Sequence, residues 1–325
     1  MRDLEHIARR LKEHLVAGEK VTHVTALSGG HSNETYLVHG IDKILRMPPS
    51  ATPLLDHALD VRGQFDLFAA LRGRPAAPPV PQLDYFCSDA EVLGAPFYLM
   101  ERVDGVAGLH FDASDLLRLA TPEVRSSISR DYLVMVANFR EIGCLDVLGP
   151  VKSNLGELQR WRRMVRDLHL PRFAALMDKI EALAPRDLPA CLVHGDCIFA
   201  NMLWKDGRLV AALDWELAFN GDPRWDLGYI LAQFDGPGGE GLPGFDLPGI
   251  WRRDEIIRFW EQATGLSAEG VLWFEAAGKA KGVAILHYGH HLWRSGLSDD
   301  RRLSEWGDFA ERIQEKAEQG LSLIG

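Results

Sequence analysis

Cysteine is scarce in this chain, and long apolar runs are missing. The 325 residues include only four cysteines, Cys87, Cys144, Cys191 and Cys197, and no two of them form a C-x-x-C pair. This pattern argues against a disulfide framework and against a zinc site built from cysteines. No apolar run approaches membrane-spanning length, and residues 1–15 lack the apolar core of a signal peptide. We therefore expect a reduced, cytoplasmic protein with no membrane partner.

Positive charge is also in short supply. With 36 basic and 46 acidic residues, the net charge is −10 at pH 7. A nucleic-acid partner requires a basic face, so the composition argues against one. Tryptophan is unevenly used, because all nine lie between Trp161 and Trp306. The chain is long enough for two lobes, and its two parts differ in composition.

The first hundred residues show the pattern of a small antiparallel sheet. Residues 1–15 read as an amphipathic helix, and residues 21–47 as three short strands joined by turns rich in Gly, Asn and Asp. A helix is expected around residues 58–71. A proline-rich connector follows at 72–82, and two further strands are expected on either side of Gly94. This β-rich region ends near Val103.

The remainder reads as mostly helical. Thr121-Pro122 is typical of a helix start, and the apolar residues that follow recur every three or four positions. Two short strands, MLWK and LVAALDW, interrupt the helices around Asp206-Gly207. We expect an α+β, bilobal, protein-kinase-like fold with a small antiparallel β-rich N-lobe and a larger helical C-lobe. The expected division is a nucleotide-binding lobe, 1–102, and a catalytic and substrate-binding lobe, 103–325.

The segment 192–228 carries the chemistry. It reads LVHGDCIFANMLWKDGRLVAALDWELAFNGDPRWDLG, with His194-Gly195-Asp196 followed five residues later by Asn201 and then by Asp214. This is the H-x-D-x-x-x-x-N spacing of a kinase catalytic loop, followed by a metal-binding Asp. Few other chemistries need this order of side chains, so the segment indicates phosphoryl transfer.

Each residue type suits one part of that reaction. Asp196 is the candidate acceptor for the proton of the incoming hydroxyl. Asn201 and Asp214 offer the oxygen ligands that Mg²⁺ prefers, and Asp214 is expected to be held at the end of a strand. His194 belongs to the same catalytic group, and we expect it to brace the loop by hydrogen bonding rather than to transfer protons.

Four phrases make the chain resemble a known family. LSGGHSNETYLV, LGAPFYLMERVDG, LVHGDCIFANML and LDWELAFNGDPRWDLGY are similar to the aminoglycoside phosphotransferases and choline kinase-like phosphotransferases. More closely, they resemble the branch found as a domain in acyl-CoA dehydrogenase family 10/11-type proteins. The resemblance implies a protein-kinase-like fold, ATP or GTP as donor, and Mg²⁺.

The resemblance also assigns roles by position. It implies that Asp222 and Asp226 support the catalytic loop. It places Gly29, Gly30 and Ser32 in a phosphate-covering loop, where glycine lets the backbone approach a nucleotide. That loop is not a strict G-x-G-x-x-G, and a plain hairpin turn is the alternative.

Two more positions are implied to recognise adenine. Glu101 and Val103 fall where a kinase hinge is expected, and their backbone groups would bind the base while the Glu101 side chain points elsewhere. An ordinary strand end is the alternative for this segment.

The chain departs from the usual family pattern at two positions. Arg46 stands where a phosphate-binding Lys is usual, and its planar guanidinium differs in geometry from a point charge. The helical Glu that would pair with it aligns with Gln64, which is neutral, so Asp60 or Asp66 is considered as a substitute. These departures weaken the ion pair that normally orients the cation.

The sequence therefore predicts a kinase for a small molecule with a hydroxyl group. The resemblance to the acyl-CoA dehydrogenase-linked branch suggests a hydroxyacyl or other organic alcohol, and the family name suggests an aminoglycoside. A protein kinase is disfavoured, because only about eight residues separate Asp214 from Asp222 and no A-P-E motif follows. The alternative function is a catalytically weak or inactive nucleotide-binding protein.

Overall fold

The computed structural model describes residues 2–27, 33–50, 52–55, 59–108, 114–234 and 241–324. The chain divides into two compact units, each with its own core. Unit 1 comprises Met1–Arg72 and Val80–Asp104, and unit 2 comprises Gly73–Pro79 and Gly105–Gly325. In the part of the chain that the structure describes, no helix is long and apolar enough to cross a membrane.

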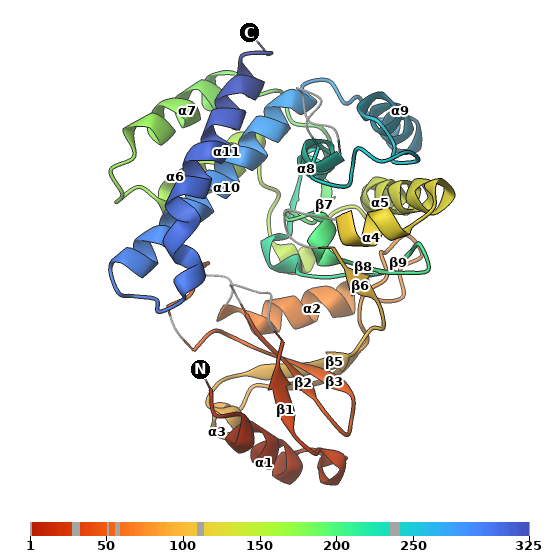
Figure 1. Ribbon diagram of the computed structural model, residues 1–325, viewed down its shortest axis with the longest axis vertical. Helices are drawn as coiled ribbons and strands as arrows, with labels where there is room; N and C mark the ends of the chain where they lie inside the picture. Colours follow the sequence, from red (N-terminus) through yellow and green to blue (C-terminus); the bar gives the residue numbers. More distant parts are fainter. Residues whose placement is uncertain are drawn as a thin grey trace. The chain divides into compact units, whose positions relative to one another are not determined.

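Unit 1 is built on an antiparallel sheet (Figure 1), in which the strand order is β1-β2-β3-β5-β4. Its elements are α1 (Leu4–His14), β1 (Val24–Ala26), β2 (Glu34–Val38), β3 (Lys43–Met47), α2 (Val61–Leu71), β4 (Leu83–Cys87), α3 (Ala90–Leu93) and β5 (Phe97–Glu101). The strands and helices expected from the sequence are all present. The helix expected around 58–71 begins at Val61, because the Asp60 side chain accepts from the Gly63 N–H and caps it.

The two faces of this sheet are covered by different helices. Alternate residues of β3 and β5, such as Leu45 and Leu99, join Leu11 of α1 and Leu93 of α3 in one apolar cluster. The other face packs against α2, where Phe65 contacts the rings of β4 and β5. Arg46 belongs to this second face, since it lies in register with Tyr98 of β5.

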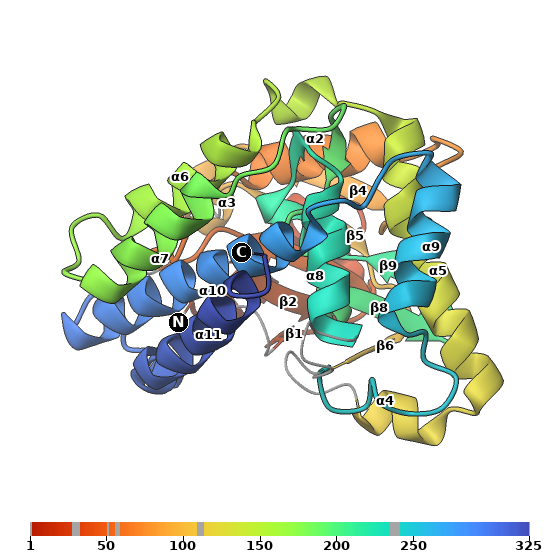
Figure 2. The same ribbon diagram turned by 90° about the horizontal axis from the view of Figure 1, so that it is seen from above.

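Unit 2 is mostly helical and holds two small sheets. Its helices are α4 (Ser114–Leu119), α5 (Pro122–Ile142), α6 (Asn154–Met164), α7 (Pro171–Ala182), α8 (Arg224–Phe234), α9 (Arg253–Thr264), α10 (Val271–Arg294) and α11 (Trp306–Leu321). Its strands are β6 (Val106–Ala107), β7 (Cys191–Val193), β8 (Met202–Lys205), β9 (Arg208–Ala212) and β10 (Phe219–Gly221). Figure 2 shows α10 running between α11 and the pair α6 and α7.

The long helix α5 shows how the sequence fixes such an element. Thr121 caps its first turn, Pro122 occupies its first position, and Gly143 follows its end with a φ of 70°. The apolar residues that recur along it every three or four positions are buried, namely Ile128, Tyr132, Met135, Phe139 and Ile142. The fold class expected from the sequence is confirmed in each unit, an antiparallel sheet in the first and a helical assembly in the second.

Candidate active site

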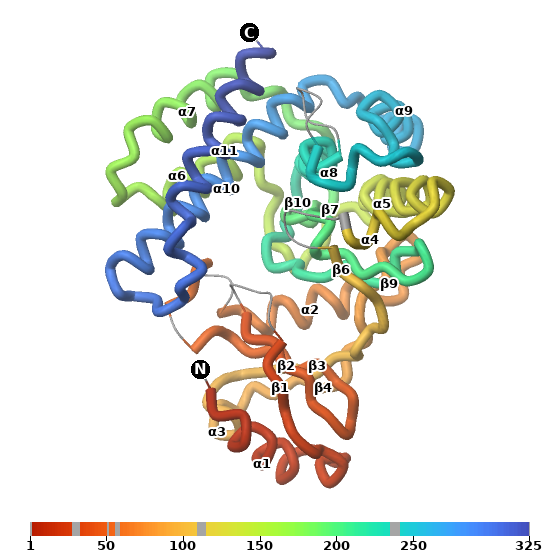
Figure 3. The backbone as a smooth tube through the Cα atoms, viewed as in Figure 1, coloured from red at the N-terminus to blue at the C-terminus, as the bar shows by residue number. Residues whose placement is uncertain are grey.

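The catalytic segment begins where β7 ends. β7 lies beside β10 (Figure 3) and pairs antiparallel with it, and the chain then turns through residues 194–201 into β8. Gly195 makes this turn with a φ of 77°, and a Cβ there would lie 2.3 Å from the Leu217 carbonyl oxygen. Only glycine fits such a position without a shift of backbone, so the glycine of the H-G-D motif is a geometric requirement.

His194 is fully buried and braces the loop. Its Nε2 lies 2.9 Å from the Leu213 carbonyl oxygen, and the Asp196 backbone N–H donates to its Nδ1 at 3.3 Å. The imidazole also packs against the Trp215 ring, with 4.3 Å between centroids. Burial lowers the pKa of His194 to about 4, so the ring is neutral near pH 7. With both ring nitrogens engaged by backbone, the geometry favours the bracing role over proton transfer.

Asp196 and Asn201 are brought together by the short 3-10 turn Phe199–Asn201. The Asn201 amide nitrogen donates to the Asp196 carboxylate Oδ2 at 2.9 Å and to the Asp196 backbone oxygen at 3.0 Å. The Asp196 side chain keeps 26 % of its surface exposed, so its carboxylate is open to solvent. Because the Asn201 amide nitrogen is engaged by Asp196, the Asn201 side-chain oxygen is the atom that can bind a cation.

Asp214 lies next to this pair through the β8–β9 hairpin. Met202 and Ala212 are in register, and the Leu213 N–H donates to the Asn201 carbonyl at 2.8 Å. The prediction that a strand holds Asp214 is wrong, because β9 ends at Ala212 and Asp214 has a left-handed backbone with φ 60°. A non-glycine residue in this region is uncommon and is maintained by surrounding contacts.

Asp226 supports the loop directly. It lies in the first turn of α8, is 1 % exposed, and accepts the backbone N–H of His194 at 2.7 Å and of Gly195 at 3.0 Å. Burial raises the pKa of Asp226 to about 7, although these two N–H donors act in the opposite direction. The carboxylate thus ties the start of α8 to the turn that presents Asp196.

Asp222 supports different segments. Its carboxylate accepts the Arg224 guanidinium at 2.7 and 3.0 Å, the Leu188 N–H at 2.9 Å and the Asn154 amide at 3.3 Å. Both members of the ion pair are nearly inaccessible to solvent. Asp222 therefore joins α8 to α6 and to the segment before β7, whereas Asp226 holds the catalytic turn itself.

Sequence reasoning missed contacts to the catalytic segment, among them those of Gln233 and Lys281. Gln233 of α8 accepts the Phe199 N–H at 2.7 Å and donates to the Cys197 carbonyl at 3.0 Å. Lys281 of α10 is 3 % exposed and donates through Nζ to the Gly195 carbonyl oxygen. The available signal was a lysine, Lys281, placed with Lys279 in the mostly apolar run VLWFEAAGKAKGVAIL, because a buried lysine needs a partner.

The predicted nucleotide residues belong to unit 1. Gly29, Gly30 and Ser32 lie outside the described residues. Arg46 of β3 donates to the Thr35 hydroxyl at 2.7 Å, and Tyr98, its register partner on β5, donates to the Gln64 side-chain oxygen at 3.4 Å.

The two aspartates considered as substitutes for Gln64 are already engaged. Asp60 caps α2, and Asp66 pairs with the exposed Arg62. The Gln64 amide nitrogen is buried and has no hydrogen-bond partner within the described part of the chain.

Glu101 ends β5, as the predicted hinge requires. Its backbone N–H donates to the Gln82 carbonyl at 2.7 Å, and its carboxylate accepts the Gln82 N–H at 3.1 Å. The side chain is thereby directed to the β4 side.

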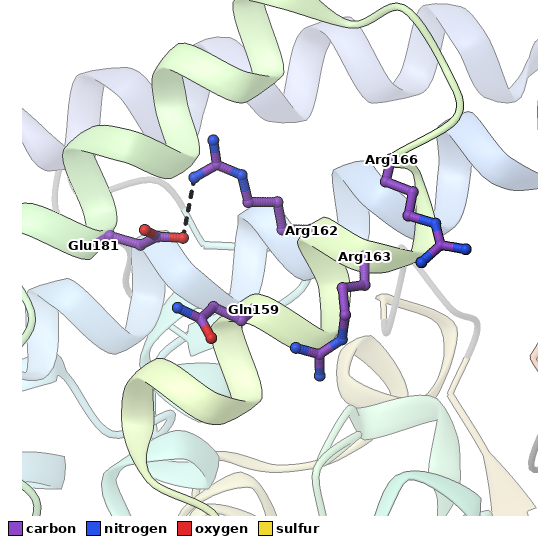
Figure 4. A pocket seen from close by; sticks show the side chains of 5 residues that line it. All are labelled: Gln159, Arg162, Arg163, Arg166 and Glu181. Atoms are coloured by element: carbon purple, nitrogen blue, oxygen red, sulfur yellow. Dashed lines mark hydrogen bonds and ion pairs between the residues drawn. The ribbon is translucent and has the colours of Figure 1, made fainter.

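A separate cavity of about 390 Å³ lies on α6 and α7 (Figure 4). Its lining residues are Gln159, Arg162, Arg163, Arg166 and Glu181, and Arg162 pairs with Glu181 at 3.1 Å. On α6, Gln159 and Arg163 lie on the face opposite Trp161, whose ring contacts Lys281. The cavity is therefore distinct from the catalytic segment.

The described residues also contain no group of three or more His, Cys, Asp or Glu that could hold a metal. A magnesium site of the kinase type needs only one or two protein ligands together with substrate phosphates. Asn201 and Asp214 fit that smaller requirement by their chemistry and by their adjacency.

All four cysteines are free thiols, and Cys197 is fully buried.

Comparison with known proteins places the chain in a family. The model of the phosphotransferase enzyme family matches residues 23–246, which include both the sheet of unit 1 and the catalytic segment. The chain belongs to this phosphotransferase family. The expected resemblance is thereby confirmed.

Curated relatives of this phosphotransferase are longer proteins, and the chain matches only a part of each. Acyl-CoA dehydrogenase family member 11 of Rattus norvegicus is 27 % identical over 99 % of the chain, which corresponds to 43 % of the relative. Acyl-CoA dehydrogenase family member 10 of Mus musculus is 31 % identical over 62 % of the chain and 19 % of the relative. The chain thus spans less than half the length of these curated relatives.

Solved structures of phosphotransferases share the fold. A Ralstonia eutropha structure attributed to an aminoglycoside phosphotransferase has a TM-score of 0.75 and 22 % identity, with 98 % of both chains covered. The GDP complex of aminoglycoside 2'-phosphotransferase-IIIa has a TM-score of 0.67 and 17 % identity, covering 98 % of this chain and 99 % of that one. The streptomycin–ATP ternary complex of APH(2")-IIa has a TM-score of 0.62 and 16 % identity, with the same coverage.

Proposed function

We propose that this phosphotransferase is a kinase that transfers the γ-phosphoryl group of ATP or GTP to a hydroxyl of a small organic molecule. The observation that carries the proposal is the Asp196 carboxylate. It is accessible, and the Asn201 amide fixes one of its oxygens at 2.9 Å. A carboxylate held in this way at the end of an H-G-D turn can accept the proton of an incoming hydroxyl.

The neighbouring residues complete the arrangement. Asn201 and Asp214 would hold Mg²⁺, which when bound offsets the negative charge of the donor phosphates. His194 and Asp226 keep the turn in place through backbone hydrogen bonds, so the Asp196 carboxylate is presented without rearrangement. Positioning of this kind accounts for most of the rate enhancement in phosphoryl transfer.

Nucleotide recognition is assigned to residues 1–102 and catalysis with acceptor binding to residues 103–325. Gly29, Gly30 and Ser32 would cover the phosphates, Arg46 would contact them, and the Glu101 and Val103 backbone would bind the base. The complexes of related structures with ATP and GDP support a nucleoside triphosphate donor. The composition supports a cytoplasmic location with no nucleic-acid partner.

For the acceptor, we propose a hydroxyacyl compound. The curated relatives carry this unit in chains named acyl-CoA dehydrogenases, and an enzyme joined to an acyl-CoA dehydrogenase is expected to act on related acyl chemistry. An aminoglycoside is the second candidate, supported by the streptomycin bound in a related structure. Only the first would give a phosphorylated acyl thioester.

A panel of acceptors tests the proposal. The purified chain is incubated with Mg-ATP or Mg-GTP and with hydroxyacyl-CoA thioesters, simple alcohols or aminoglycosides, and the phosphorylated product is detected by mass spectrometry. We expect turnover that Mg²⁺ stimulates and that Asp196→Ala abolishes. Asp308→Ala removes an exposed carboxylate on α11 and is the matched control, with activity unchanged.

One outcome favours the non-catalytic alternative. Gln64 stands in place of the usual acidic partner of Arg46, which is the feature that motivates a weak or inactive nucleotide-binding protein. Nucleotide binding without phosphoryl transfer to any hydroxyl compound in the panel would contradict the kinase proposal and support that alternative.

A further inference from the structure

Lys281 is a buried cation whose contacts converge on the catalytic turn. It lies in the middle of α10 and is 3 % exposed. Its ammonium lies over the Tyr229 ring at 4.7 Å and near the Trp161 ring at 5.2 Å. An ammonium withdrawn from water is costly unless charged or polar groups compensate for the lost solvation. The groups that compensate therefore indicate why the lysine is there.

Those groups belong to Gly195 and Asp196. Nζ of Lys281 donates to the Gly195 carbonyl oxygen and lies 3.8 Å from Oδ1 of Asp196. The other carboxylate oxygen, Oδ2, accepts the Asn201 amide at 2.9 Å. Each oxygen of the Asp196 carboxylate thus has its own neighbour, a neutral donor on one side and a cation on the other.

Other charges near Lys281 are already engaged. Glu157 receives the Trp161 indole N–H at 3.0 Å and pairs with Arg160 at 3.2 Å and Lys152 at 3.5 Å. Asp226 accepts two backbone N–H groups of the catalytic turn. Burial lowers the pKa of Lys281, while the charges of Asp196, Glu157 and Asp226 raise it and that of Arg160 lowers it further. Among the described residues, Asp196 is the carboxylate within ion-pair distance of the ammonium.

We propose that Lys281 is a positioning residue for phosphoryl transfer. Its ammonium fixes the Gly195 peptide and one edge of the Asp196 carboxylate, so that the carboxylate meets the acceptor hydroxyl in a single orientation. The inference rests on the proposed kinase function. It adds α10, which no kinase motif in the sequence identifies, to the elements that set the geometry of the reaction.

The first test separates positioning from binding. Lys281→Met keeps the length of the side chain and removes its charge, and it should lower kcat about 10- to 100-fold, the loss expected from a small misplacement of a reacting group. KM for ATP and for the acceptor should stay within about twofold, because Lys281 contacts neither substrate in this scheme. Lys281→Arg keeps the charge and should recover part of kcat.

A matched control accounts for destabilisation. Arg253→Met breaks another ion pair of α10, the contact between Arg253 and Glu275, whose carboxylate is also buried. We expect it to lower the melting temperature and leave kcat unchanged at a temperature where the protein is folded. If Lys281→Met fails to fold, Lys281→Arg, with its displaced donors, provides the test. A lower kcat with an unchanged KM supports the positioning role, and an unchanged kcat contradicts it.

A double-mutant cycle with Asp196→Asn tests the route of action. If Lys281 acts through Asp196, then Lys281→Met should have no further effect on the residual turnover of Asp196→Asn, followed with radiolabelled ATP. Independent, additive losses would overturn the inference, as would a normal kcat for Lys281→Met in an enzyme that Asp196→Asn inactivates. Full activity of Asp196→Asn, or no transfer by the unmodified chain, would instead overturn the proposed function and the inference with it.

Discussion

The Asp222–Arg224 pair makes a quantitative prediction about stability. The two side chains are 0 % and 4 % exposed, and their contacts reach α6 and the segment before β7. Asp222→Ala leaves the Arg224 guanidinium buried without its carboxylate. Removal of one partner of a buried pair typically costs about 3–5 kcal/mol. For a unit of this size, roughly 2–4 °C per kcal/mol gives a fall in melting temperature of about 6–20 °C.

Thermal unfolding followed by near-ultraviolet circular dichroism is the assay, with Arg172→Ala as control. Arg172 pairs with Glu318 and Glu311 on the surface at 2.7 and 2.9 Å, with 44 % of its side chain exposed. Loss of such an exposed pair costs about 0–1 kcal/mol and should shift the transition only slightly.

The double variant Asp222→Ala/Arg224→Met separates a broken pair from a general loss of packing. It removes both charges, so it should be less destabilised than Asp222→Ala alone. The catalytic turn makes its contacts with Asp226, so kcat at low temperature should be retained in Asp222→Ala. A shift no larger than that of Arg172→Ala, or a double variant less stable than the single one, would refute the reasoning.

Two further predictions follow from the site. Burial moves two neighbouring groups in opposite directions, since the pKa of His194 falls from 6.5 to about 4 and that of Asp226 rises from 3.8 to about 7. As the pH falls from 7 to 4, the unfolded state takes up a proton on His194, which costs about 3 kcal/mol of stability. Protonation of folded Asp226 over the same range returns about 3 kcal/mol. The free energy of unfolding of His194→Gln, measured by denaturant titration, should therefore increase as the pH falls over this range. A dependence on pH parallel to that of the unmodified chain would contradict these shifts. In unit 1, Arg46→Met should raise KM for ATP about 10- to 100-fold, because a charge-assisted phosphate contact is lost. Arg46→Lys should restore part of the affinity for ATP. An unchanged KM would show that Arg46 does not contact the nucleotide.

Much of the fold was predictable because its signals are local. The strands of unit 1 alternate along the chain and are separated by turn residues, and α5 carries both a cap and an apolar stripe. The strands β7 and β10 were not predicted, because three-residue segments are too short to show alternation and are defined by their pairing. The left-handed backbone of Asp214 was missed for a similar reason. It follows an apolar run that reads as a strand, and the hydrogen bond from Leu213 to Asn201 ends that run.

The catalytic spacing was equally visible, but spacing alone does not distinguish one carboxylate from another. Asp196, Asp222 and Asp226 are the same residue type within one segment, and only their surroundings separate them. Asp196 is accessible, Asp222 is neutralised by a buried arginine, and Asp226 is buried against backbone N–H groups 31 and 32 residues away in sequence. The first is open to solvent, and the other two are not. Lys281 adds a contact over 86 residues, which no local pattern encodes, because the packing of α10 brings it to the turn. If the kinase proposal holds, variants should divide along these lines, with losses of kcat at Asp196 and Lys281 and losses of stability at Asp222.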